Sequence, residues 1–155
     1  IIFVIFSGSL FADGHGIPKS GTINWVTGWY FDLPPTQPQA DGYSISSGNA
    51  IGATFNVNGS GLLHEGRALC SAVAIVGPDV GASNKGNCYF GDRDGDRIYT
   101  SFTGDLSKAG GINTIIAGTG KYKGITGSGP WECEFPGEAD NGAFNCRQSL
   151  TYEIK

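Results

Sequence analysis

The chain has few of the residues on which many common protein functions depend. Its 155 residues include no methionine and only two histidines, and charged residues make up 15% of the total. The formal net charge is −4, and no run of lysine or arginine is present. Because nucleic-acid binding depends on a basic surface, we expect no nucleic-acid partner. The mild acidity is typical of ordinary solubility.

Sustained helical periodicity is also missing. The longest candidate, residues 62–70, is interrupted by Gly66, and glycine is unfavourable inside a helix. The 26 glycines follow no fixed period, which excludes collagen. They separate short runs rich in β-branched and aromatic residues. This composition predicts many short strands joined by tight turns.

The N-terminal segment is the most apolar part of the sequence. Residues Ile1–Phe6 are all apolar, small and apolar residues continue to Ala12, and a polar run begins at Asp13. This order is typical of the hydrophobic region and cleavage end of a secretory signal, and the apolar part is too short to span a bilayer. The alternative is a retained first strand. We therefore expect residues 1–12 to be a signal-peptide remnant or an N-terminal strand, and residues 13–155 to be one domain.

Four cysteines, with no C-x2-C spacing, give little support to a zinc site, and we expect no metal and no cofactor. We favour the pairs Cys70–Cys88 and Cys133–Cys146, because each brackets one loop between neighbouring candidate strands. Four cysteines allow two other connectivities, which stay open. Disulfides favour an oxidising compartment, so the protein is predicted to be secreted or periplasmic.

Strand candidates recur along the whole chain. Residues 22–31 alternate, with Trp25 and Trp29 on one face. Residues 33–38 are rich in proline and are expected to form a loop, and a second loop is expected at 77–86. The other predicted strands are 43–47, 50–57, 68–76, 87–90, 97–103, 112–117, 121–127, 131–135 and 144–154. About eight to ten antiparallel strands with frequent turns indicate an all-β barrel or sandwich.

One segment carries a family resemblance. Residues 118–127 have the sequence GTGKYKGITG, in which a glycine pair permits a tight hairpin and Tyr122 is an apolar anchor. This resembles a hairpin of the allene oxide cyclase barrel superfamily, which includes plant dirigent proteins and secreted bacterial domains of unassigned activity. Residues 86–99 are similar to the bacterial members. The resemblance covers residues 68–155 and implies an eight-stranded antiparallel, lipocalin-like barrel that is filled or holds one small ligand.

Candidate chemistry is sparse. The three aspartates of the 92–96 turn resemble the start of a calcium loop, but Thr103 stands where an EF-hand has glutamate. We predict a polar hairpin turn with Gly95 at positive φ. His64 is not part of an HExxH motif, and no G-x-S-x-G elbow occurs. Glu132 and Glu134 alternate with apolar neighbours and are expected to face solvent. No catalytic residue is assigned, and cyclase activity is not carried over to any position.

Three aromatic residues are the best candidates for ligand contact. Trp25, Trp29 and Phe55 are predicted to lie on inward faces of early strands, where they could stack on an apolar molecule. The alternative is plain core packing. Three functions remain open: a secreted barrel that binds a small apolar molecule or has inherited the fold without catalysis; a cyclase or dirigent-type enzyme that guides a reactive intermediate; and a structural subunit that self-associates by exchange of the N-terminal strand.

Overall fold

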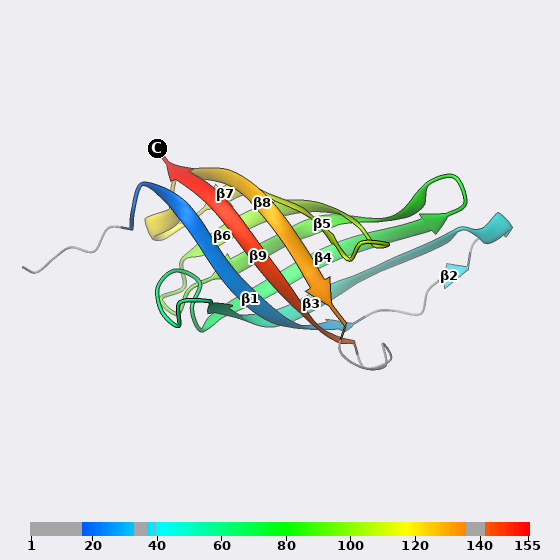
Figure 1. Cartoon of the computed structure of the whole chain (residues 1–155), viewed down its shortest axis with the longest axis horizontal. Helices are drawn as coiled ribbons and strands as arrows, with labels where there is room; N and C mark the ends of the chain where they lie inside the picture. Colours follow the sequence, from blue (N-terminus) through cyan, green and yellow to red (C-terminus); the bar gives the residue numbers. More distant parts are fainter. Residues whose placement is uncertain (1–16, 33–36, 39, 136–141) are drawn as a thin grey trace, which may run out of the picture.

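Eight antiparallel strands close into a barrel in the computed structural model, which describes residues 17–32, 37–38, 40–135 and 142–155 (Figure 1). The neighbour order is β1-β9-β8-β7-β6-β5-β4-β3, and pairing of β1 with β3 completes the closure. The short strand β2 extends the sheet beside β3. The strands are β1 (Ser20–Asp32), β2 (Gln37–Pro38), β3 (Ser44–Asn56), β4 (Gly66–Gly77), β5 (Gly81–Gly91), β6 (Arg97–Asp105), β7 (Gly110–Gly118), β8 (Ile125–Glu134) and β9 (Ala143–Ile154), with 3-10 turns η1 (Ala40–Gly42) and η2 (Gly120–Tyr122). The predicted eight-stranded antiparallel barrel is confirmed.

Several predicted boundaries differ from the structure because the strands are longer than their apolar runs. The expected strands 43–47 and 50–57 form the single strand β3, and 121–127 with 131–135 contribute to η2 and β8. The predicted loop 77–86 is wrong, since β5 begins at Gly81. Ladder hydrogen bonds to both neighbours hold glycine-rich and polar stretches that have little strand propensity of their own.

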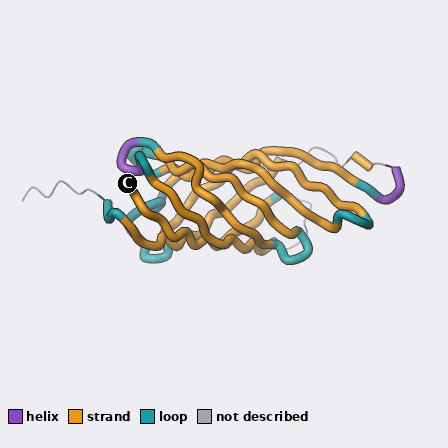
Figure 2. The backbone as a smooth tube through the Cα atoms, turned by 90° about the horizontal axis from the view of Figure 1, so that it is seen from above, coloured by secondary structure: helices purple, strands orange, loops and turns teal. Residues whose placement is uncertain are grey.

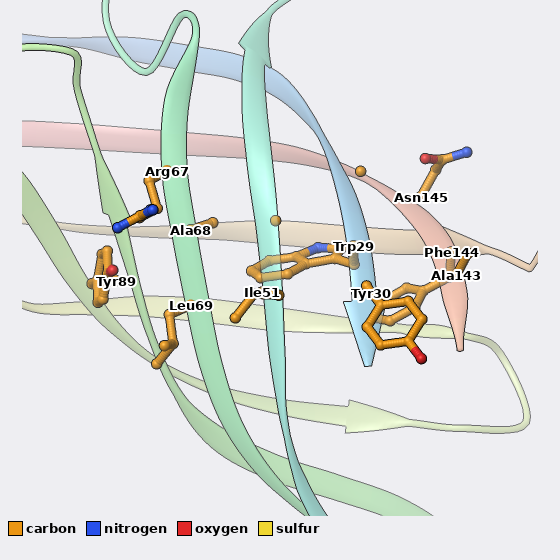
Figure 3. Close-up of a pocket in the computed structure, with 12 residues that line it drawn as sticks. Trp29, Tyr30, Ile51, Arg67, Ala68, Leu69, Tyr89, Ala143, Phe144 and Asn145 are labelled. Atoms are coloured by element: carbon orange, nitrogen blue, oxygen red, sulfur yellow. The ribbon is translucent and has the colours of Figure 1, made fainter. Parts of the chain in front are cut away.

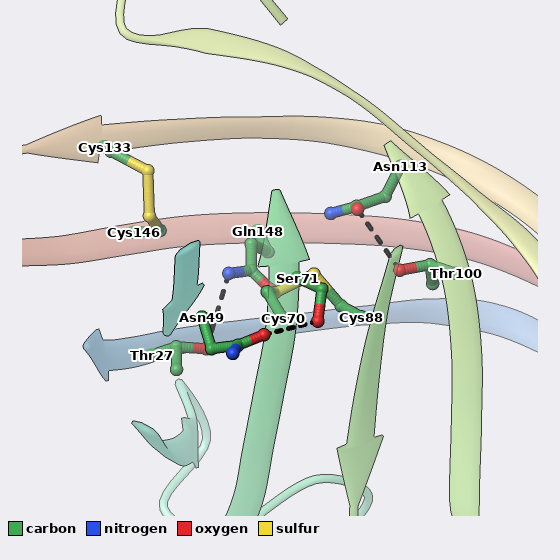
Figure 4. The surroundings of a disulfide bond; sticks show 10 residues. All are labelled: Thr27, Asn49, Cys70, Ser71, Cys88, Thr100, Asn113, Cys133, Cys146 and Gln148. Carbon is green, nitrogen blue, oxygen red and sulfur yellow. Dashed lines mark hydrogen bonds between the residues drawn. A yellow bond between two sulfur atoms is a disulfide. The ribbon is translucent and has the colours of Figure 1, made fainter. Parts of the chain in front are cut away.

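Both predicted disulfides are present (Figure 4). Cys70 and Cys88 are directly opposed on β4 and β5, and Cys133 and Cys146 are opposed on β8 and β9. Each bridge therefore joins neighbouring strands, as the sequence spacing predicted. By chain-entropy reasoning each closure stabilises the fold by about 3 kcal/mol.

The strand register sets the shape of the barrel. A row of directly opposed outward residues starts on β1 at Thr22, passes through all the other barrel strands, and returns to β1 at Asp32, ten residues further along. Such a stagger requires strongly tilted strands. The row is Thr22, Thr151, Ser128, Thr114, Ser101, Asn87, Ser71, Asn49 and Asp32.

The two ends of the barrel differ. At the closed end, η2 and the β3–β4 connection place Tyr122 and Leu63 in the core with no solvent exposure. At the other end, β1 stops at Asp32, opposite Asn49, so residues 44–48 of β3 continue past it. We call residues 44–48, 72–76 and 82–86 of β3, β4 and β5 the apron; Figures 1 and 2 show this part of the sheet extending beyond β1, β8 and β9.

Candidate functional site

The closed end is tied together by Asp92. Its carboxylate accepts hydrogen bonds from the Tyr122 hydroxyl and the Leu63 backbone N–H, each at 2.5 Å. The Lys121 ammonium lies 2.8 Å from Asp92 and 2.5 Å from Asp94. The two segments that carry the family resemblance therefore contact each other, and together they plug this end of the barrel.

The hydrogen bonds and charges of this plug stabilise the protonated forms of Tyr122 and Lys121, as expected for a structural element. Gly95 has φ 94°, as predicted for a hairpin turn. Burial, together with the Asp92 carboxylate, raises the pKa of Tyr122 far above its usual range. Burial alone would lower the pKa of Lys121, but hydrogen bonds and charge attraction from Asp92 and Asp94 raise it. In the described part of the chain, no group of three or more acidic, His or Cys side chains is placed to hold a metal.

A second feature, a row of inward-facing residues, crosses the barrel wall from β1 to β5. Trp25 is opposed by Gln148 on β9, which is opposed by Trp131 on β8. The row continues through two glycines to Asn84, where it enters the apron, and it ends on β3. In order it is Trp25, Gln148, Trp131, Gly111, Gly104, Asn84, Ala74 and Ser46.

This inner row, as we call it, contains most of the unpartnered buried polar atoms of the described residues. The atoms are Trp25 Nε1, Gln148 Oε1, Trp131 Nε1 and Asn84 Oδ1. The other end of the Gln148 amide donates to the Thr27 hydroxyl at 3.4 Å (Figure 4). A buried polar group without a partner costs about 1–3 kcal/mol. A cluster of such groups in one row indicates a place where a ligand or ordered water completes the hydrogen bonds.

Aromatic rings border the inner row on the apron side. Trp29 stacks on Phe144 with ring centroids 6.3 Å apart, and Phe31 meets Phe144 edge-on at 6.3 Å. Phe102 meets Trp131 edge-on at 5.9 Å. Phe31, Phe102 and Phe144 are only partly buried. We call these five aromatic residues, together with Gln148, Asn84 and the inner face of the apron, the open half of the barrel.

The open half is uncharged. The buried polar side chains of the described residues are Thr27, Thr54, Asn56, Thr100, Asn113 and Gln148. Thr100 donates to Asn113 at 3.3 Å, on a wall that also bears the disulfides (Figure 4). Hydroxyl and amide groups of this kind can donate and accept hydrogen bonds, but they do not exchange protons near neutral pH. The arrangement is suited to holding and orienting a neutral molecule.

The structure separates the three predicted ligand-contacting residues. Trp25 is 1% exposed and packs edge-on against Phe90 at 5.1 Å, within the filled half. Trp29 borders the open half. The prediction that Phe55 faces inward is wrong: it is 49% exposed on the outer wall, beside His64.

The position of Trp29 helps to explain which residues of β3 face the interior. A Cβ on the inward-facing Gly52 would lie 2.8 Å from the Trp29 ring, so this position on the inner face of β3 has space only for glycine. The same inner face of β3 also carries Ala50, Thr54 and Asn56. Because side chains alternate between the two faces of a strand, Phe55 lies on the outer face. Glu132 and Glu134 face solvent as predicted.

The sequence analysis did not identify Gln148 or Asn84 as candidate site residues. It also did not identify Trp131, which lies opposite Gln148 in the inner row. A usable signal existed for Gln148, which shares its face with Cys146 and Leu150 and is therefore a polar residue at an inward position. Asn84 had no such signal, because it falls in the segment that was expected to be a loop.

The outward-facing side chains of β3 and its neighbours border a cleft on the outer wall of the barrel. The cleft has a volume of about 840 Å3, and its rim is formed by the directly opposed residues Tyr30, Ile51, Leu69 and Tyr89 (Figure 3). Arg67 and Asn145 supply its polar groups. Its lining also includes Trp29 and Phe144 of the open half, but no residue of the inner row.

Comparison with known proteins supports the fold. No protein-family model and no curated protein matches the sequence. The solved pterocarpan synthase dirigent protein GePTS1 is similar with a TM-score of 0.53 and 9% identity, over 98% of this chain and 100% of that one. For the pterocarpan synthase dirigent protein PsPTS1 the values are 0.55 and 10%, over 88% and 97%. The dirigent-like barrel is therefore confirmed at the level of the fold.

Proposed function

We propose that the protein binds a small apolar molecule in the open half of its barrel and orients it without acid–base catalysis by its own side chains. The observation that carries the proposal is the contrast along the inner faces of the strands. Inward residues of β3, β4 and β5 are buried toward the closed end, and in the apron they are partly exposed and small. Partly exposed aromatics beside unpartnered polar atoms are typical of a small-molecule site.

A dirigent-type role is the second candidate, and the similarity of the fold to two dirigent proteins favours it. In that role the barrel would hold a reactive intermediate made elsewhere, and the shape of the open half would decide how it closes. Orientation alone can contribute several kcal/mol to such a step. An oxidising compartment fits the two disulfides. No helix among the described residues is long and apolar enough to cross a membrane.

Equilibrium binding of indane, a small apolar ring compound, tests the main proposal. The three tryptophans of the chain provide a fluorescence signal, with calorimetry as an independent measurement. Ala74→Leu adds bulk to the inner face of the apron, and Ala117→Leu makes the same change on the exposed outer face of β7. We expect saturable binding that Ala74→Leu weakens at least about tenfold and Ala117→Leu leaves unchanged.

Two results would overturn this proposal. One is the absence of saturable binding. The other is a wild-type affinity in Ala74→Leu combined with a loss in Ile51→Asn, which would place the site in the outer cleft. Self-association through residues 1–6 stays a prediction, because these residues lie outside the described part of the structure.

A further inference from the structure

We infer that Asn84 and Trp131 select a ligand that carries a hydroxyl group on an uncharged apolar body. This inference rests on the proposed binding in the open half and adds the chemical group that is recognised there. The two residues belong to the inner row, and each has a buried polar atom without a partner: an acceptor, Asn84 Oδ1, and a donor, Trp131 Nε1.

The two side chains meet over one glycine. A Cβ on Gly104 would lie 2.3 Å from Asn84 Oδ1 and 2.3 Å from Trp131 Cζ2, the ring carbon next to the one that bears Nε1. The indole ring and the amide oxygen therefore both lie against Gly104, in space that the Cβ of any other residue would occupy. Trp131 is 8% exposed, so its N–H has lost nearly all contact with solvent.

An acceptor and a donor on two side chains that lie against the same glycine fit one kind of neutral group. A hydroxyl accepts a hydrogen bond from Trp131 Nε1 and donates its own hydrogen to Asn84 Oδ1. A carbonyl would satisfy Trp131 alone. A hydrocarbon would leave both groups unpaired, which is how binding sites built for hydroxyls reject analogues that lack them.

Charged ligands are disfavoured at the same place. The side chains that supply the unpartnered polar atoms of the inner row are all neutral, and a carboxylate buried without a counter-charge is strongly destabilised. The ion pairs of the described part lie at turns and on the outer wall. The site therefore discriminates against anions as well as against plain hydrocarbons.

Three probes with the same ring system test the preference for a hydroxyl separately from the discrimination against anions: indane, 2-indanol and indane-2-carboxylate. Their dissociation constants are measured by calorimetry with the full chain. We expect 2-indanol to bind at least about tenfold more tightly than indane, since two hydrogen bonds are gained, and the carboxylate to bind more weakly than either.

Two substitutions then locate the preference. Asn84→Leu removes the acceptor and Trp131→Phe removes the donor, and each should reduce the ratio between 2-indanol and indane to about threefold or less. Asn87→Leu is the matched control, because Asn87 lies on the exposed outer face of the same strand. It should keep the wild-type ratio. Because the ratio compares two ligands on one variant, a modest loss of stability does not affect it.

The outcomes distinguish this inference from the proposed function. Equal wild-type affinities for indane and 2-indanol would overturn the inference, with ordered water satisfying the two groups, and would leave binding in the open half intact. A wild-type ratio in both Asn84→Leu and Trp131→Phe would also overturn it. If neither indane nor 2-indanol binds, the proposed function itself fails.

Discussion

The closed and open ends of the barrel are built from the same strands, but their inner faces differ in size and in hydrogen bonding. At the closed end Tyr122 and Leu63 fill the interior, and Asp92 satisfies both the Tyr122 hydroxyl and the Leu63 N–H. In the open half, partly buried aromatic rings lie beside small residues of the apron, and the polar atoms of Asn84 and Trp131 lack partners. At the closed end Asp92 provides partners for the polar groups that are buried around it, whereas Asn84 and Trp131 have no such partner.

Truncation of Tyr122 should have the largest effect on stability. Tyr122→Ala leaves a void at the closed end, and we expect a loss of about 3–5 kcal/mol in the free energy of unfolding. Phe102→Ala removes a ring of the open half that is only partly buried, and it should cost less than half as much. Urea unfolding of both variants measures the difference. Equal losses would show that the two ends are packed alike.

Removal of each disulfide compares the contributions of the two cross-links to stability. Replacement of either pair by alanine should lower stability by about 3 kcal/mol, since the bridges close loops of similar length, with sequence separations of 18 and 13. Cys133 is partly exposed, whereas Cys70 and Cys88 are buried. Mild reductant should therefore open Cys133–Cys146 first, as followed by thiol alkylation and mass spectrometry. Simultaneous reduction would contradict this order.

Alkaline pH should weaken the closed end selectively. The folded-state pKa values of Tyr122 and Lys121 are raised above those of the unfolded chain. Their stabilisation is therefore complete below about pH 10, and it is lost as the pH rises through the folded values. Tyr122→Phe should lose about 1.5–3 kcal/mol at pH 7 and should show a shallower alkaline decline.

The control for this pH profile is Tyr30→Phe. Tyr30 is 55% exposed on the outer wall, and its replacement should leave the dependence of the urea midpoint on pH unchanged. An identical profile in Tyr122→Phe would show that the phenol does not contribute to the alkaline loss.

The smallest effects should come from enlarging two alanines on the inner face of β4. Ala68 has no solvent exposure, so Ala68→Leu overpacks the filled half and should cost about 1–3 kcal/mol. Ala74 is partly exposed in the apron, and Ala74→Leu should change stability by no more than about 0.5 kcal/mol. Thermal unfolding of the two variants side by side checks the contrast, and a large loss in Ala74→Leu would mean that the apron is already fully packed.

Much of the fold could be predicted from short-range patterns. The alternation around Trp25 and Trp29 identified the inner face of β1, the cysteine spacing identified both disulfides, and the glycines around Tyr122 identified the turn between β7 and β8. These features depend on residues close together in the chain or on one repeating period, which is why a single sequence reveals them.

The inner side of β3 and the composition of the open half were decided by the tertiary structure. Phe55 is the larger apolar choice for the core, yet it lies on the outer face, while on the inner face of β3 the Trp29 ring packs against Gly52. Asn84 and Trp131 meet over Gly104 only because the register of β5 to β8 aligns them once the barrel has closed. The sequence by itself determined where most strands lie and which cysteines pair, although it did not reveal that the segment from Gly81 belongs to β5. Register and the limited volume of the interior determined which of them face one another.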